Sequence, residues 1–334
     1  MGTFVGRYPT TRLRRLRQGP AVRRLVREAS ITPSHLIQAV ILREEHDPAE
    51  IKGLGGITRL TVDEAAELAL RAQEAGLGGL ALFPFTGAED RDEAGSLAFE
   101  PDNLMGRAAR RLKEAAPDVF LIADVALDPY TDHGHDGLMD EDGRILNDAT
   151  IEALTSQAKV LAQAGFDCIA PSDMMDGRIG AIRHALDSAG FEDTLILSYA
   201  VKYASAFYGP YRAAVGSKGA LKGDKKTYQM DPANAAEGIR EAALDVREGA
   251  DMLMVKPALA YLDMVQRVRS EFGLPTIAFH VSGEYAMLRA ASDLGALDFD
   301  RALLETLLCF RRAGADAVIT YAAEMASKLL RETA

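Results

Sequence analysis

Residues 251–257 read DMLMVKP, an apolar run that ends on Lys256 and is closed at once by Pro257. A lysine is unfavourable in an ordinary core strand, because removing its charge from water costs several kcal/mol or forces the amine to lose its proton. The run TLILSYAVK, residues 194–202, ends in the same way on Lys202. Both stretches therefore predict buried strands whose last residue is a functional amine.

Six more apolar runs of this kind occur along the chain, and a helix-patterned stretch follows each one. The eight runs span residues 36–42, 76–83, 119–127, 167–172, 194–202, 251–256, 275–282 and 316–322. Most are continuously apolar, as expected of strands covered on both faces. Eight strands alternating with helices predict a (β/α)8 barrel over residues 36–334, with an open doubly wound sheet as the alternative.

The intervening helices carry recognisable start and stop signals. Thr61 stands three residues before Glu64, which predicts a capping box, and Gly76 is expected to end that helix. Asp231 is expected to cap a second helix, with Pro232 at its first position. Further helices are predicted at 104–115, 150–164, 177–190, 258–272, 284–293, 300–313 and 323–332.

Composition narrows the class of protein. The chain has 334 residues, of which 48% are apolar in type and 26% are charged, so it has ample material for a core and is not expected to be disordered. No apolar run reaches the ~20 residues of a membrane helix, and the first residues lack the apolar segment of a signal peptide. Cys168 and Cys309 lie far apart without metal-ligand spacing, which favours reduced thiols in a cytoplasmic protein.

The charge is unevenly distributed. The first 27 residues contain eight arginines and no acid, whereas the remainder has 49 acidic against 30 basic residues. Residues 1–35 are therefore expected to form a basic N-terminal arm. Only Phe4 and Tyr8 are available there for stacking on bases, so we expect the arm to dock on the acidic surface of a second copy and expect no nucleic-acid or membrane partner. An Arg-rich targeting peptide is the weaker alternative.

A 28-residue connection, 203–230, follows the strand that ends on Lys202. A loop of this length at one position of a barrel is usually functional, often as a cover over the site. It carries five basic residues, Arg212, Lys218, Lys222, Lys225 and Lys226. Positive charge on such a loop suits a substrate with a carboxylate or a phosphate, although a solvated loop would have a similar composition.

The two strand-ending lysines favour covalent chemistry. Adjacent strands lie about 4.8 Å apart, so inward-pointing amines on them would approach closely. Burial and the neighbouring positive charge both disfavour the ammonium form, and a neutral amine forms imines with ketones. Alternatively, each lysine could pair with a barrel carboxylate or reach solvent.

Five motifs in this order closely resemble the porphobilinogen synthase, or 5-aminolevulinate dehydratase, family: APSDMMDGR (170–178), SYAVKYASAFYGPYR (198–212), YQMDPAN (228–234), DMLMVKPALAYLD (251–263) and HVSGEYAML (280–288). The resemblance runs from about residue 120 to the end and is weaker before it. It implies a lyase of tetrapyrrole biosynthesis that condenses two molecules of 5-aminolevulinate into porphobilinogen with loss of two waters.

The resemblance also implies roles for individual residues. Lys256 would form the imine with the first substrate, in the P site, and Lys202 with the second, in the A site. From the loop, Arg212 and Lys225 would hold the A-side carboxylate with help from Gln229. The remaining expected contacts are Ser282 and Tyr321 on the P-side carboxylate, Tyr208 and Phe207 over the substrates, and Ser172 and Asp124 near the lysines.

The stretch DVALDPYTDHGHDG, residues 124–137, resembles a metal-ligand cluster by composition. Zinc-dependent relatives have three cysteines where this chain has Ala126, Asp128 and Asp136, so zinc is not expected to bind. Electrostatic and proton-transfer roles are expected for Asp124, Asp128 and Asp136.

A second metal question concerns Glu248, which would be the ligand if an allosteric magnesium were present. Other relatives have an arginine at the preceding position, where its guanidinium takes the place of the cation, and here that residue is Arg247. We therefore expect no required cofactor.

The resemblance implies a homo-oligomer, an octamer or a hexamer, assembled through the arm. Two other functions remain possible at this stage. One is another imine-forming barrel of the class I aldolase type, and the other is a non-catalytic barrel that serves as an assembly module.

Overall fold

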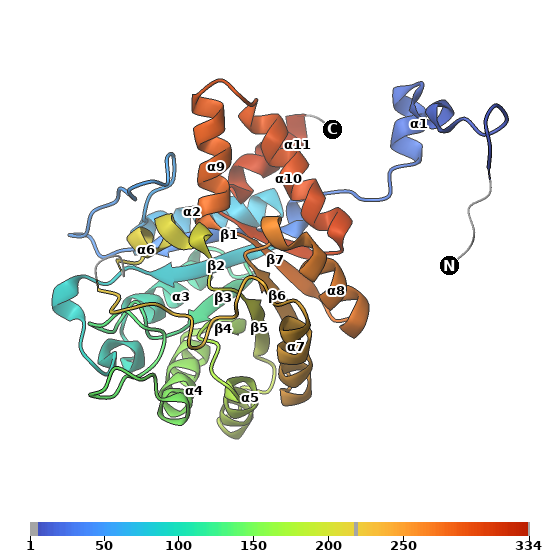
Figure 1. Ribbon diagram of the computed structural model, residues 1–334. Coiled ribbons are helices and arrows are strands. Elements are labelled where there is room, and N and C mark those ends of the chain that lie inside the picture. Colours follow the sequence, from blue (N-terminus) through green and yellow to red (C-terminus); the bar gives the residue numbers. More distant parts are fainter. Residues whose placement is uncertain (1–5, 217–219, 333–334) are drawn as a thin grey trace.

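The computed structural model describes residues 6–216 and 220–332. Eight parallel strands form a closed barrel in which each strand pairs with the next along the chain and β8 pairs with β1 (Figure 1). The strands are β1 Leu36–Leu42, β2 Gly79–Pro84, β3 Leu121–Val125, β4 Cys168–Pro171, β5 Leu195–Lys202, β6 Met252–Lys256, β7 Thr276–His280 and β8 Ala317–Thr320. The predicted (β/α)8 barrel is confirmed.

Helices surround the barrel (Figure 1). They are α2 Val62–Ala75, α3 Leu104–Ala115, α4 Asn147–Ala164, α5 Arg178–Ser188, α7 Ala236–Glu248, α8 Leu262–Phe272, α9 Ser282–Asp293, α10 Phe299–Ala313 and α11 Ala323–Glu332. The capping box of Thr61 and Glu64 is formed, and Gly76 ends α2 in the left-handed conformation. The bounds predicted for α3 and α11 coincide with those in the structure.

The predicted start of α7 is wrong. The helix begins at Ala236, and Asp231 instead accepts a hydrogen bond from the Ala233 backbone amide at 2.9 Å. The Asn234 amide also donates to the Asp231 carbonyl at 2.9 Å, which closes a turn. An aspartate followed by proline suits such a turn as well as it suits a helix cap, so local composition did not decide between them. The helix predicted from residue 258 likewise begins only at Leu262, after the 3-10 turn Leu259–Tyr261.

The strands provide the core of the molecule. Every residue of β1, β2, β3, β4 and β7 is buried, because the helices cover the sheet on one face and inward side chains fill the other. Cys168 and Cys309 are both free thiols. Within the described residues, no helix has the length and apolar character needed to cross a membrane.

The arm extends away from the barrel (Figure 1). It contains the 3-10 helix Leu13–Arg17 and the short helix α1 Pro20–Leu25, and neither has a buried residue. The leucines of these two helices are exposed, Leu25 at 84% and Leu13 at 66% of their full accessible surface. Among the described residues of this chain, none covers these leucines.

The connection after β5 passes over the carboxyl end of the barrel. It contains the 3-10 turn Ala206–Tyr208 and helix α6 Gly209–Ala214, which contacts α9. Lys218, one of the five basic residues noted in this loop, lies outside the described residues.

Candidate active site

Lys202 and Lys256 are direct partners in the ladder between β5 and β6. Each is the last residue of its strand, and their exposed fractions are only 5% and 4%. Both side chains line one cavity at the carboxyl end of the barrel, where the active sites of such barrels lie. As predicted, the two lysines lie side by side and face the same cavity.

An irregularity in β5 produces this alignment. Leu197 and Ser198 pair with Met252 and Leu253, but Val201 and Lys202 pair with Val255 and Lys256. Two residues of β5 thus stand opposite one residue of β6, which is a β-bulge. Without the extra residue, Lys256 would align with Val201, and Lys202 would point to the opposite face of the sheet.

The Lys256 amine lies among aromatic rings. Its Nζ atom is 4.2 Å from the ring centroid of Phe279 and 4.9 Å from those of Tyr199 and Tyr211, with Tyr208 and Phe83 just beyond. Ring faces attract an ammonium ion, but the loss of water outweighs this attraction. Burial, followed by the positive charge of Lys202, lowers the pKa of Lys256 to about 7. A large fraction of this amine is therefore neutral at neutral pH.

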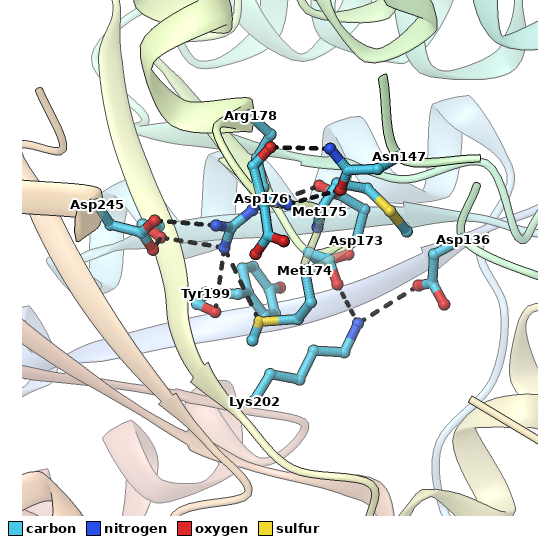
Figure 2. A network of polar contacts seen from close by, with 12 residues as sticks. Asp136, Asn147, Asp173, Met174, Met175, Asp176, Arg178, Tyr199, Lys202 and Asp245 are labelled. Atoms are coloured by element: carbon cyan, nitrogen blue, oxygen red, sulfur yellow. Dashed lines mark hydrogen bonds and ion pairs between the residues drawn. The ribbon is translucent and has the colours of Figure 1, made fainter. Parts of the chain in front are cut away.

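The Lys202 amine has polar surroundings. It donates a hydrogen bond to the backbone carbonyl of Ser172, in the loop after β4. It also lies 3.4 Å from Oδ1 of Asp136 (Figure 2). The two lysines are thus neighbours with different environments, one apolar and one beside a carboxylate.

Asp128 and Asp136 are bridged by Lys225 from the loop after β5. The Lys225 Nζ atom lies 3.0 Å from Oδ2 of Asp128 and 2.7 Å from Oδ2 of Asp136, and all three side chains are buried. Burial alone would raise the pKa of Asp136, but Lys202 and Lys225 together hold it well below its usual range. Although burial opposes it, the two carboxylates raise the pKa of Lys225. The three side chains thus form a buried ion triad that favours the charged form of Asp136.

Asp124, near the end of β3, differs from Asp136 because its pKa is raised and not lowered. Burial raises its pKa to about 6, against the opposing effect of Lys256 and Lys202. Its Oδ1 atom is buried and has no hydrogen-bond partner among the described residues. A carboxyl group that titrates near neutral pH beside two amines is suited to exchanging protons with them.

Two more of the predicted residues have unpaired polar atoms. The Tyr321 hydroxyl and the Gln229 side-chain carbonyl are buried, and no described residue bonds to either atom. Leaving such groups unpaired is costly, so they are suited to contact a polar ligand. Ser282 is buried as well, and its hydroxyl accepts a hydrogen bond from the Tyr211 amide at 2.9 Å.

The cavity itself is small, about 20 Å³, which leaves room for about one water molecule. The predicted residues lining it are Asp128, Asp136, Ser172, Lys202, Tyr208, Arg212, Lys225, Gln229 and Lys256, joined by Tyr211. Asp124, Phe207, Ser282 and Tyr321 are not part of this lining. Because Tyr208, Tyr211 and Arg212 come from the loop after β5, this loop must move before a substrate can enter.

Sequence reasoning missed two groups of residues around the site. The first is the rings around Lys256 other than the predicted Tyr208, namely Phe83, Tyr199, Tyr211 and Phe279. Tyr199 and Tyr211 lie inside a quoted motif, and Phe279 directly precedes another. The second is a pair of arginines from earlier parts of the chain that contact the end of α6. Arg59 donates to the carbonyls of Ala213 and Ala214 at 2.7 Å each, and Arg91 donates to that of Val215 at 2.9 Å. No local pattern indicates that these distant arginines hold the last carbonyls of a short helix.

The residues at the zinc position do not fit that metal. Ala126 offers no ligand atom, and Lys225 lies between Asp128 and Asp136, where a cation would otherwise balance them. Among the described residues, no group of three or more histidine, cysteine or carboxylate side chains is placed to hold a metal ion. Glu248 accepts a hydrogen bond from the Gly180 amide at 3.1 Å, and Arg247 is exposed.

Comparison with known proteins gives a consistent result. Residues 10–329 match the family model "Delta-aminolevulinic acid dehydratase". The protein of that name from Bradyrhizobium diazoefficiens is 53% identical over 321 residues, covering 96% of this chain and 91% of the relative. The one from Rhodobacter capsulatus is 50% identical and covers 97% of both chains.

A solved structure agrees with these sequence matches. The Toxoplasma gondii delta-aminolevulinic acid dehydratase (porphobilinogen synthase), in complex with the reaction product porphobilinogen, superposes with a TM-score of 0.94 at 49% identity and covers 97% of this chain and 92% of its own. With the matched motifs and the paired lysines, these relationships show that the chain belongs to the delta-aminolevulinic acid dehydratase family.

Proposed function

We propose that this chain condenses two molecules of 5-aminolevulinate into porphobilinogen with loss of two waters. The observation that carries the proposal is the alignment of Lys202 with Lys256 at one cavity, because two ketone substrates require two amines side by side. Membership of the family makes the chain a dehydratase and argues against both the aldolase-type barrel and the non-catalytic assembly module.

Lys256 is the first nucleophile. Its amine is partly neutral at neutral pH, so its lone pair can add to the ketone carbon of the first substrate, and loss of water then gives an imine. Lys202 forms the second imine beside Asp136 and the Ser172 carbonyl, which stabilise the positive charge of a protonated imine. Asp124 accepts and returns protons between these centres.

Substrate carboxylates are bound by two sets of groups. Arg212 lines the cavity, and no described carboxylate lies within ion-pair distance of it, so it is suited to bind the A-side carboxylate with Gln229. Ser282 and Tyr321 bind the P-side carboxylate, while Tyr208 and Phe207 pack over the substrates. Lys225 is already neutralised by Asp128 and Asp136, so its predicted contact with a substrate requires that triad to open.

The reaction needs no metal in this proposal, since the ion triad supplies a resident positive charge where zinc-dependent relatives have cysteines. The arm, with its exposed apolar side chains and arginines, binds an acidic surface of a second copy and builds a homo-oligomer. The cytoplasmic location expected from the sequence remains a prediction. A relative from Physcomitrium patens, 47% identical, is named as chloroplastic, so compartments differ within the family.

The test combines product formation with covalent trapping. Protein stripped of metal is incubated with 5-aminolevulinate and assayed for a pyrrole product, and a parallel sample is reduced with borohydride and mapped by mass spectrometry. We expect pyrrole formation and a substrate adduct on Lys256 and on Lys202. The absence of both product and adduct would refute the proposed function.

A further inference from the structure

Arg178, the first residue of α5, is buried beneath the site, with an exposed fraction of 2%. Its Nη1 atom donates to Oδ1 of Asp245, on α7, at 2.9 Å, and its Nε atom lies 3.8 Å from Oδ2 of Asp173. A buried arginine with two carboxylates is costly to desolvate, and such groups are weak evidence for stability alone. The other contacts of Arg178 indicate a second role, in positioning the site.

The first of these contacts is the bulge of β5. The Arg178 Nη2 atom lies 3.5 Å from the carbonyl oxygen of Tyr199 (Figure 2). The same atom lies 3.5 Å from the Ser198 hydroxyl. The Ser198 hydroxyl donates in turn to Asp245. A bulge disrupts the ladder locally, so its backbone groups need other partners, and Arg178 provides one for Tyr199.

The side chains around the bulge show how it changes the direction of the β5 side chains. The Tyr199 ring faces the Lys256 amine inside the barrel, whereas Ser198 reaches Asp245 of the outer helix α7. In regular alternation, Lys202 would share the outward face with Ser198, because the two are four residues apart. The extra residue reverses this and turns Lys202 into the barrel.

The second contact is the loop after β4. Met174 has a φ of 71°, in the left-handed region that side chains other than glycine rarely occupy. Its sulfur lies 3.9 Å from the Arg178 Nη2 atom, and Asp173 faces Nε of the same guanidinium. The residue just before them is Ser172, whose carbonyl receives the hydrogen bond from Lys202. Strained backbone of this kind persists only where the surroundings hold it.

One guanidinium therefore contacts both segments that determine where the Lys202 amine lies, through the Tyr199 carbonyl in β5 and the side chains of Asp173 and Met174 next to Ser172. We propose that Arg178, held by Asp245, is a positioning residue for Lys202 that stabilises the β5 bulge from one side and the Ser172 carbonyl from the other. The inference rests on the proposed imine at Lys202. It assigns no role to Arg178 at Lys256, because the contact of Arg178 with Tyr199, a ring neighbour of Lys256, is with the backbone carbonyl and not with the ring.

The test is the distribution of trapped imines between the two lysines. In Arg178→Lys, a single ammonium cannot make all the contacts of the guanidinium, and in Asp245→Asn its charged anchor is lost. After borohydride reduction with 5-aminolevulinate, both variants should retain the Lys256 adduct and lose most of the Lys202 adduct. Their kcat for pyrrole formation should fall about 100-fold, the scale expected for a misplacement of about 1 Å.

Leu112→Ala is the control for general destabilisation, because Leu112 is fully buried in α3, on another part of the barrel. It should lower the melting temperature and leave the ratio of the two adducts unchanged. A wild-type adduct ratio in Arg178→Lys or Asp245→Asn would overturn the inference, and if one variant fails to fold the other decides. Absence of both adduct and pyrrole product in the wild-type protein would instead refute the proposed function.

Discussion

The Nζ atom of Lys256 lies 4.2 Å from the ring centroid of Phe279, although its ladder partner Lys202 has a carbonyl and a carboxylate as neighbours. Aromatic rings exclude water from the Lys256 amine, whereas polar protein atoms take the place of water around the Lys202 amine. The difference follows from the walls of the cavity and not from the strands, which present both lysines in the same way. It leads to a prediction about pH.

Imine formation at Lys256 should increase with pH through about 7, because only the neutral amine attacks the ketone and the pKa of Lys256 is about 7. The positive charge of Lys202 contributes to this lowered pKa, so Lys202→Met should raise it and move the midpoint of trapping to higher pH. Initial rates of borohydride trapping from about pH 5 to about pH 9 measure this. Lys159→Met, on the exposed face of α4, is the control, and an unshifted midpoint in Lys202→Met would contradict the prediction.

Lys225→Met should destabilise the protein by about 3–5 kcal/mol, because it leaves the buried charges of Asp128 and Asp136 without their ammonium partner. Its neighbour Lys226 is exposed and forms a surface ion pair with Asp224, so Lys226→Met should change the free energy of unfolding by less than about 0.5 kcal/mol. Urea unfolding of both variants checks the difference. Equal stabilities would mean that the triad is not formed in solution.

Arg59→Gln should loosen α6, since it removes the donors to the carbonyls of Ala213 and Ala214. Amide exchange in residues 209–215 should become faster by about tenfold, corresponding to about 1.4 kcal/mol of lost local stability. The KM for 5-aminolevulinate should rise, because α6 carries Arg212. Arg71→Gln, which removes a surface ion pair with Glu324, should alter neither quantity. Unchanged exchange in Arg59→Gln would exclude a role for Arg59 in holding the helix.

Removal of divalent metal should leave the activity intact, because Lys225 occupies the position between Asp128 and Asp136 and Glu248 is bonded to the Gly180 amide. The measurement is the rate of pyrrole formation after treatment with EDTA, with added monovalent salts as a second variable. Complete loss of activity that Mg²⁺ restores would show a required magnesium.

Deletion of residues 1–30 should give a folded but smaller and poorly active species. The arm has no buried residue in its two short helices, so the barrel does not need it to fold, whereas its exposed leucines and arginines need a partner surface. Light scattering of the deleted and full-length proteins measures the assembly. A deleted protein of full size and full activity would refute the role of the arm.

The local sequence pattern alone was sufficient to predict the fold and several helix bounds. Continuous apolar runs between helix signals predicted the barrel, because strands covered on both faces must be apolar throughout. The bounds of α3 and α11 and the capping box of Thr61 and Glu64 depend on interactions within a few residues. The sequence alone also indicated that Lys202 and Lys256 are functional, because a buried strand in an ordinary core does not favour a lysine at its end.

Only the tertiary structure decided how these parts act together. The bulge in β5 depends on a register with β6 and on Arg178 from α5, and no property of residues 195–202 alone reveals it. Asp128 and Asp136 receive their counter-charge from a lysine about 90 residues away in the chain, and five rings from separate segments surround Lys256. Proton affinity and side-chain direction are set by neighbours in space, which a linear pattern does not specify.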